Sequence, residues 1–339
     1  MAHELSRRRV LSGIAGAAAA VPMAHMARAQ TPKLDDVKII SAGGNLTPIY
    51  EALINEFGFF KKFGLNYNIT YGSDASKFMG SLLTGENDLC PTAGITQMFP
   101  AVGKGARMKI VNGAVLLGQQ AIFSGKPEIK TVKDLAGKTI GIGALGTQLH
   151  HTVVALMTKY GVDPNTVTWA NVGSTADVLR AISTQRIDAG PAQIDVIPNM
   201  DKFGIHMVDG TEAWIHLADY PFQGGFASDA VIAQKRDLLV CSLAGYAAMW
   251  RFIASPNSKD AFRAARRKAL TGSGEDFDAA SDFQWEFFQK VQPFALDLII
   301  SPERIAYAQK VEAEGNQEIL PYDKVTDMSL ARDAIKLLG

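Results

Sequence analysis

Strand, loop and helix follow one another in a regular order along this chain, and that order constrains the fold more than any other feature. Apolar, strand-like runs at 37–42, 65–71, 89–92 and 108–117 alternate with stretches whose apolar residues recur at helical spacing. Such units, about 25 to 30 residues long, predict a parallel sheet with right-handed helical crossovers. Ligands of such sheets bind beyond the carboxyl ends of the strands.

The same order begins again at residue 120. Strand-like runs at 120–124, 138–143, 167–172 and 187–192 enclose two further helical stretches. The length of 339 residues also exceeds that of a common single domain. We therefore expect an α/β fold with two lobes, each a mostly parallel sheet flanked by helices, and a ligand cleft between the lobes.

The rest of the chain should return to the first lobe. Residues 209–226 are rich in aromatic residues and glycine, a strand is expected at 230–233, and the helical period then continues to residue 314. Leaving one lobe and returning requires two crossings, which we place near 119–123 and 214–223. The expected parts after the N-terminal segment are 30–121 (first part of lobe 1), 122–219 (lobe 2) and 220–339 (return to lobe 1 and C-terminal helices).

The first 29 residues are typical of an export signal. Arginines at positions 7–9 precede an alanine-rich apolar run, and Ala27-Arg28-Ala29 fits a cleavage site. The paired arginines indicate the twin-arginine route, and the run is too short for the alternative, a membrane anchor. Cleavage would leave 30 basic and 33 acidic residues. This mature chain, expected in the periplasm, is unsuited to nucleic acid.

A glycine-rich turn after the expected strand 138–143 predicts a binding element. The unpaired N–H groups of the following helix can hold an anion, and Thr147 can add a hydroxyl. Gly141, Gly143 and Gly146 also spell G-x-G-x-x-G. The next strand, 167–172, ends without the acidic residue that dinucleotide binding needs. We therefore expect no dinucleotide and no other cofactor.

Three segments resemble periplasmic solute-binding proteins of ABC importers. TVKDLAGKTIG at 131–141 resembles the start of the second lobe in that family, and LTGEND at 83–88 and AISTQRIDA at 181–189 resemble its helix-to-strand joints. The nearest branch serves nitrate, sulfonates, taurine and thiamine-pyrimidine precursors. The resemblance implies the type II periplasmic-binding-protein fold and hinge closure around a ligand.

The resemblance also implies which residues bind the ligand. They follow the first three strands of lobe 1, begin the helix after residue 143, and follow the third strand of lobe 2: Gly43, Gly44, Asn45, Ser73, Ala93, Gly94, Gly146, Thr147, His150, Gln193 and Asp195. Asp195 would suit a ligand with a hydrogen-bond donor or a positive charge, or it caps the helix that follows. Because these loops contain no arginine, backbone N–H groups and hydroxyls would hold an anion.

Catalytic chemistry has little support in the sequence. Adjacent helix residues point about 100° apart, so His150 and His151 cannot both face the cleft or chelate one metal, and no metal site is expected. His150 contacts ligand, or it is a solvated or a core histidine. No G-x-S-x-G motif is present. Cys90 and Cys241 are separated, unlike the cysteine-rich motif of related pyrimidine-forming enzymes, and either pair with each other or remain free thiols.

The sequence therefore predicts a periplasmic, non-enzymatic substrate-binding protein. It would capture a small organic, anionic solute of sulfonate or carboxylate type and deliver it, as a monomer, to the permease and ATPase subunits of an ABC importer in the inner membrane. Two alternatives remain open. One is a ligand-binding partner of a membrane sensor, and the other is a pyrimidine-precursor binder or enzyme on the same fold.

Overall fold

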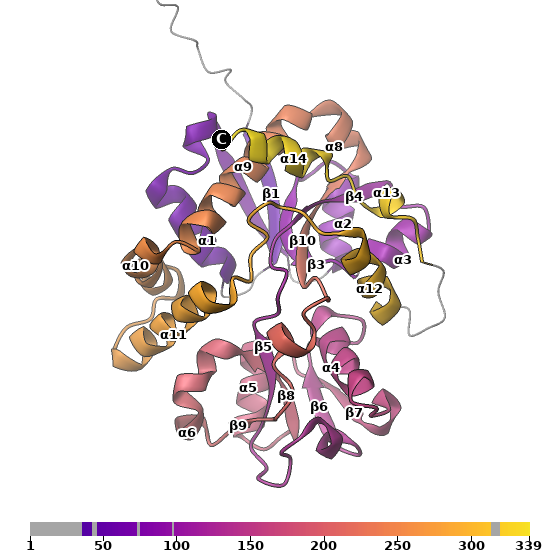
Figure 1. Cartoon of the computed structure of the whole chain (residues 1–339), viewed down its shortest axis with the longest axis vertical. Coiled ribbons are helices and arrows are strands. Elements are labelled where there is room, and N and C mark those ends of the chain that lie inside the picture. Colours follow the sequence, from indigo (N-terminus) through magenta and orange to yellow (C-terminus); the bar gives the residue numbers. More distant parts are fainter. Residues whose placement is uncertain (1–35, 43–45, 73–74, 97, 313–318) are drawn as a thin grey trace, which may run out of the picture. The chain divides into compact units, whose positions relative to one another are not determined.

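The computed structural model describes residues 36–42, 46–72, 75–96, 98–312 and 319–339. Its strands form two groups, and we call the parts built on them lobe 1 and lobe 2 (Figure 1). Lobe 1 contains β1 (Val37–Ala42), β2 (Tyr67–Gly72), β3 (Cys90–Gly94), β4 (Met108–Gly113) and β10 (Gln223–Ser228). Lobe 2 contains β5 (Gln120–Ser124), β6 (Thr139–Ile142), β7 (Thr168–Asn171), β8 (Ala189–Gln193) and β9 (His206–Met207).

Each lobe is mostly parallel, with antiparallel strands where the chain enters or returns. In lobe 1, β1 and β2 are parallel, a single bridge from Ile39 to Leu89 connects β1 to the start of β3, and β10 runs antiparallel between β3 and β4. The order in lobe 2 is β7-β6-β8-β5-β9, in which β6 is parallel to β7 and β8 and β5 is antiparallel to β8 and β9. The expected two-lobed α/β architecture agrees with these sheets.

Helices flank the strands of both lobes (Figure 1). The α-helices are α1 (Leu46–Phe57), α2 (Ala75–Leu83), α3 (Met98–Gly103), α4 (Gln148–Lys159), α5 (Thr175–Ser183), α6 (Met200–Phe203), α7 (Ala213–His216), α8 (Asp229–Gln234), α9 (Arg236–Ile253), α10 (Lys259–Leu270), α11 (Glu275–Val291), α12 (Pro302–Glu312), α13 (Tyr322–Val325) and α14 (Ser329–Lys336). Short 3-10 helices are η1 (Lys61–Phe63), η2 (Val132–Leu135), η3 (Pro164–Thr166), η4 (Ile194–Asn199) and η5 (Pro256–Ser258).

The prediction of a strand at 230–233 is wrong. These residues belong to α8, whose start is capped by Ser228, because the Ser228 hydroxyl accepts a hydrogen bond from the Val231 N–H. The returning strand is instead β10, which begins QGG and ends at this cap residue. Two glycines disfavour a strand by propensity. Close packing requires them here, because a Cβ on Gly224 would lie 2.7 Å from the Asn112 carbonyl oxygen.

An aromatic cluster around Trp250 on α9 forms the centre of lobe 1. The Trp250 ring is fully buried and lies 6.5 Å from the rings of both Tyr50 and Phe294. Large buried rings of this kind contribute much of the apolar area that stabilises a core. Among the described helices, none is by itself long and apolar enough to cross a membrane. Within the described ranges, α9 and residues 256–270 together meet those criteria of length and composition, but the two are bent by 87°.

Lobe 2 contacts α11 through α7 and α6. Trp214 of α7 packs edge-on against Phe287 of α11, with ring centroids 5.1 Å apart. Lys202 of α6 forms an ion pair with Asp276 of α11. The two lobes are therefore held by side-chain contacts on this side in addition to the chain crossings.

Candidate functional site

The start of α4 follows β6 after a tight turn. Gly146 has φ +75°, a conformation that glycine adopts without steric cost. Thr147 is the N-cap residue, and its hydroxyl donates to the Ala144 carbonyl oxygen at 2.7 Å instead of accepting from the helix N–H groups. The first backbone hydrogen bond of the helix runs from the His151 N–H to the Thr147 carbonyl oxygen. The N–H groups of residues 148–150 therefore precede the hydrogen-bonded ladder and carry the partial positive charge of a helix N-terminus.

This end of α4 lies against lobe 1. The Gln148 side-chain Nε2 donates to the Phe222 carbonyl oxygen at 2.6 Å. Gly94, at the end of β3, approaches so closely that a Cβ there would lie 3.2 Å from the Gln148 Cβ. One turn further along α4, the His151 Nδ1 hydrogen-bonds the Thr96 hydroxyl at 3.1 Å. The helix end that can hold an anion is thus positioned where the two lobes meet.

Three glutamines lie where β8 ends and β5 begins, namely Gln193 at the end of β8, Gln120 at the start of β5 and Gln119 directly before it. The side-chain oxygens of Gln119, Gln120 and Gln193 are buried and have no hydrogen-bond partner among the described residues. Gln120 and Gln193 are register partners of an antiparallel pair, so their side chains lie next to each other on one face. An unpaired buried amide oxygen costs about 1–3 kcal/mol. A bound molecule with hydrogen-bond donors would remove that cost.

β6 and β8 run parallel, so their carboxyl ends meet at one edge of the sheet in lobe 2. α4 begins after β6 and Gln193 ends β8, so Gly146, Thr147 and Gln193 share this edge. Ala93 and Gly94 end β3 and reach it from lobe 1. Gly43, Gly44, Asn45 and Ser73 lie outside the described residues. The glutamines at 119 and 120 and the side chains of Gln148 and Thr96 were not anticipated, because no motif marks them.

The surroundings of Asp195 fit neither of the two predicted roles, ligand contact and helix capping. Its carboxylate Oδ2 accepts a hydrogen bond from Arg266 Nη2 of α10 at 2.5 Å, and the two side chains are 12% and 5% exposed. The N-cap residue of η4 is Gln193, and no side chain caps it. Burial raises the pKa of the Asp195 carboxyl, and the Arg266 charge opposes that change. Because Arg266 neutralises Asp195, the aspartate no longer argues against an inorganic anion as ligand.

His150 and His151 are both buried, as the core-histidine interpretation expects. The His150 Nδ1 accepts a hydrogen bond from the Gly146 N–H at 3.2 Å, and its ring packs edge-on against Trp169 at 4.7 Å. Burial, with a smaller contribution from the neighbouring His150, lowers the pKa of His151 to about 4. In the part of the chain that the structure describes, no three His, Cys, Asp or Glu side chains are grouped to hold a metal ion. Cys90 and Cys241 are free thiols.

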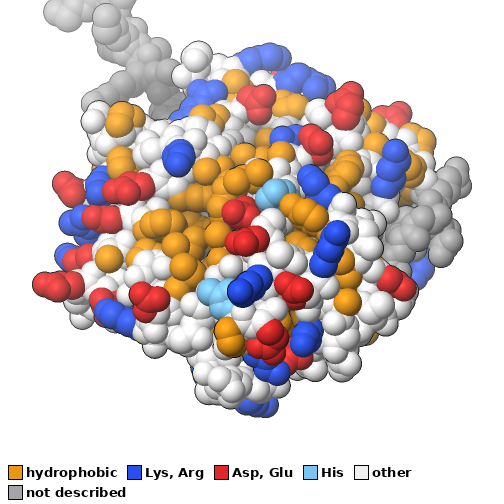
Figure 2. Space-filling view, turned by 60° about the horizontal axis from the view of Figure 1, so that its bottom comes forward, with side chains coloured by type: hydrophobic (Ala, Val, Ile, Leu, Met, Phe, Trp, Pro, Cys, Tyr) orange, Lys and Arg blue, Asp and Glu red, His pale blue; other side chains and the backbone are white. Residues whose placement is uncertain are grey.

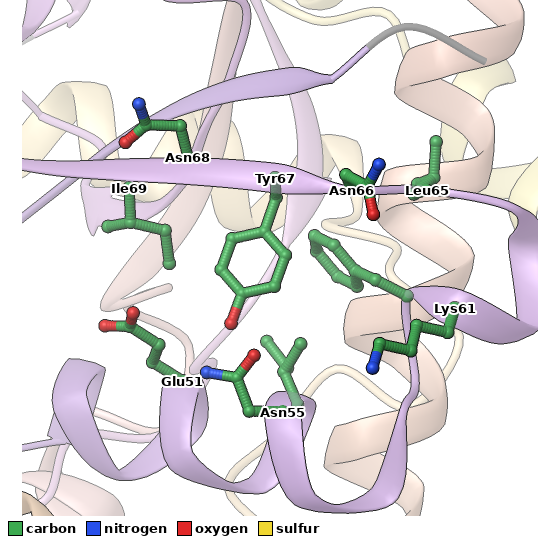
Figure 3. Close-up of a pocket in the computed structure, with 10 residues that line it drawn as sticks. Glu51, Asn55, Lys61, Leu65, Asn66, Tyr67, Asn68 and Ile69 are labelled. Carbon is green, nitrogen blue, oxygen red and sulfur yellow. The ribbon is translucent and has the colours of Figure 1, made fainter.

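A separate cavity of about 350 Å³ lies between α1 and β2, at the outer edge of lobe 1 (Figure 3). Tyr67 points from β2 toward Glu51 and Asn55 of α1 in this view. None of the described residues that the sequence predicted to bind ligand lines this cavity. On the face shown in Figure 2, positive and negative side chains are interspersed and no extended basic patch is present.

The strand orders, with β5 and β10 as the strands of entry and return, define the α/β periplasmic-binding-protein fold. The periplasmic aliphatic sulphonate binding protein SsuA from Escherichia coli is 15% identical, with a TM-score of 0.67 over 87% of this chain and 92% of that one. The periplasmic nitrate-binding protein NrtA from Synechocystis PCC 6803 is 13% identical, with a TM-score of 0.67 over 91% and 90%. The desulfurization enzyme DSZB is 14% identical, with a TM-score of 0.59 over 90% and 100%. The expected fold class is confirmed.

The chain belongs to the NMT1/THI5-like family, whose model matches residues 43–254. This stretch includes the whole of lobe 2 and every residue that the sequence predicted to bind ligand. The family resemblance seen in the sequence is therefore confirmed. Among curated proteins, none matches this chain.

Proposed function

We propose that this protein is the periplasmic substrate-binding component of an ABC importer. It captures a small organic, anionic solute between its lobes and delivers it to the permease and ATPase subunits in the inner membrane. The family membership and the fold shared with sulfonate- and nitrate-binding proteins support this class of function. The proposed export signal of residues 1–29 lies outside the described residues and accords with a periplasmic location.

One observation carries the proposal, namely that the N-terminus of α4 abuts lobe 1 at Phe222 and Gly94. An anion held there contacts lobe 2 through the helix N–H groups and lies within reach of lobe 1. Ligands close two-lobed proteins to the extent that they bind the closed arrangement better than the open one. A site at the junction of the lobes meets that requirement, whereas the cavity between α1 and β2 touches lobe 1 alone.

Gln120 and Gln193, which lie near the start of α4, restrict the chemical class of the solute further. Helix N–H groups favour a sulfonate, carboxylate or nitrate group, and they do not distinguish among these. The unpaired oxygens of Gln120 and Gln193 require donors, which a solute with hydroxyl, amine or amide groups supplies and nitrate does not. A polar organic anion therefore fits the set of groups better than an inorganic one.

The experiment that tests this function is a thermal-shift screen of residues 30–339 after unfolding and refolding, which removes any carried ligand. The panel contains alkyl and aryl sulfonates, nitrate, aromatic and dicarboxylic acids, and pyrimidines. A true ligand at 100 times its Kd should stabilise the protein by about 2.7 kcal/mol. Hits are then incubated with the protein and recovered, because a binding protein returns the solute unchanged.

Variants identify the site. Thr147→Ala combined with Ser73→Ala should weaken binding by about 1 to 3 kcal/mol while the free protein stays folded. Ser73→Ala removes a hydroxyl proposed to contact the ligand, and Thr147→Ala removes the hydrogen bond to the Ala144 carbonyl that fixes the turn before α4. Thr84→Ala, an exposed threonine at the end of α2, is the matched control and should leave binding unchanged. Unchanged affinity in the double variant would place the ligand elsewhere. Turnover of a hit would instead favour an enzyme, a function that the fold of the desulfurization enzyme DSZB also accommodates.

A further inference from the structure

A second cavity lies along the side of α4, from His150 in its first turn to Lys159 at its end. Its volume is about 720 Å³. His150, Val154 and Thr158 line it from one stripe of α4, at the i, i+4 spacing that places residues on one helix face. The opposite wall is formed by α12, through Tyr307, Lys310 and Val311. The cavity is thus bounded on one side by elements of lobe 2 and on the other by a helix of the C-terminal part of the chain.

The size of this cavity suits a small organic molecule. Ligand sites are commonly cavities of about 300–1,000 Å³ with mostly apolar walls and a few polar groups. The walls here combine aliphatic Val154 and Val311 with the aromatic rings of Trp169 and Tyr307. The two rings come from different elements, β7 and α12.

Both rings are held in place by neighbours. The His150 ring packs edge-on against the Trp169 ring at 4.7 Å. The Tyr307 ring contacts the Tyr220 ring, also edge-on, at 6.5 Å between centroids. Both Trp169 and Tyr307 are half-buried, so each ring keeps a surface that is open to the cavity. Fixed aromatic rings bind planar ligands with little loss of side-chain entropy.

The charged groups at this cavity favour an anion. Lys159 and Lys310 contribute two ammonium groups, and Asp219 contributes one carboxylate. The Lys159 ammonium donates to the His216 carbonyl oxygen, while Lys310 on α12 is exposed. Burial and the nearby Asp219 raise the pKa of Tyr307, so its hydroxyl remains a neutral donor. A net positive charge beside two aromatic rings matches a ligand with an aromatic ring and one anionic group.

We propose that this cavity is a second small-molecule site, distinct from the site at the α4 N-terminus, and that it binds an aromatic carboxylate. Because its walls come from α4 and α12, an occupant stabilises the arrangement in which these helices face each other. Binding there is therefore coupled to the relative position of the lobes.

The test measures binding of 4-fluorobenzoate to the full chain by fluorine NMR titration. Cyclohexanecarboxylate competes as the non-aromatic acid and 4-fluorobenzamide serves as the uncharged aromatic control. We expect both controls to bind at least about tenfold more weakly, since each lacks one of the two recognised features. Lys310→Glu, which changes an exposed side chain, should weaken 4-fluorobenzoate by about tenfold or more. Tyr307→Ala should do the same, whereas Tyr307→Phe keeps the ring, loses only the hydroxyl donor and should weaken binding less than Tyr307→Ala.

Thr147→Ala separates the two sites. It should leave 4-fluorobenzoate affinity unchanged while it weakens the solute bound at the α4 N-terminus, so the two proposals can fail separately. The second site is refuted if 4-fluorobenzoate does not bind at millimolar concentration. It is equally refuted if Lys310→Glu has no effect, or if Thr147→Ala abolishes binding.

Discussion

Protonation of His151 should destabilise the fold in mild acid. The folded-state pKa of about 4 lies below the ordinary value of 6.5, because the imidazole is buried and lies beside His150. Between these values the folded state binds fewer protons than the unfolded state. The stability that neutral His151 contributes is therefore complete above about pH 6.5 and decreases as the pH falls toward 4.

The size of the effect follows from the two pKa values. Relative to neutral pH, the loss from this one group is about 1.4 kcal/mol at pH 5.5 and about 2.5 kcal/mol at pH 4.5. Carboxylates also titrate in this range, so the comparison must be made with a variant. His151→Asn removes the titration and retains a side-chain polar atom near the Thr96 hydroxyl, to which the His151 Nδ1 is bonded at 3.1 Å.

The assay is urea unfolding followed by tryptophan fluorescence at pH 7.5, 5.5 and 4.5. The stability of the wild type relative to His151→Asn should fall with pH by the amounts given above. His206→Asn, at a half-buried position whose Nε2 lies 2.8 Å from the Ile129 carbonyl oxygen, controls for the loss of a histidine elsewhere. Parallel pH profiles for the wild type and His151→Asn would refute the reasoning, because they would mean that His151 titrates alike in the folded and unfolded states.

Two further predictions concern stability. Arg266→Met leaves the buried Asp195 carboxylate unpaired and should lower the free energy of unfolding in urea by about 3–5 kcal/mol. The double variant with Asp195→Leu should recover most of that loss. If Arg266→Met were as stable as the wild type, the ion pair would be contradicted. Gly225→Ala places a Cβ 2.0 Å from the Asn112 side-chain oxygen and should lower stability by about 1–3 kcal/mol. The control is Gly80→Ala in α2, where no atom lies within 4 Å of the new Cβ, and it should raise stability by about 0.5–1 kcal/mol. Equal effects at the two glycines would count against close packing of β10.

The sequence predicts most elements of this fold because local signals and tertiary packing agree. In α5, for example, the Ser174 hydroxyl accepts from the Asp177 N–H and the Asp177 carboxylate accepts from the Ser174 N–H, which is the capping box that the letters S-T-A-D spell. β10 is the exception. Its glycines are needed because neighbouring backbones lie close to it, and a sequence pattern does not contain the position of those neighbours.

The candidate site likewise contains parts that local sequence signals predict and parts that depend on distant residues. The start of α4 is predictable, because glycines and Thr147 mark the turn that exposes its N–H groups. The partner of Asp195 is not, because Arg266 is 71 residues further along the chain and reaches it only through the packing of α10 beside η4. Gln120 and Gln193 become neighbours through the register of β5 and β8, and register depends on the whole sheet.

The position of β10 has a consequence for the order in which the protein folds. Residues 120–207 supply every strand of the lobe 2 sheet, so that sheet can form from one continuous segment. The lobe 1 sheet cannot be completed until residues 223–228 insert between β3 and β4, which precede them by more than 100 residues of chain. Closing so long a loop is slow, because its entropy is lost before the strand contacts form. Lobe 2 should therefore acquire its structure first during refolding, and the insertion of β10 should limit the rate at which lobe 1 becomes native.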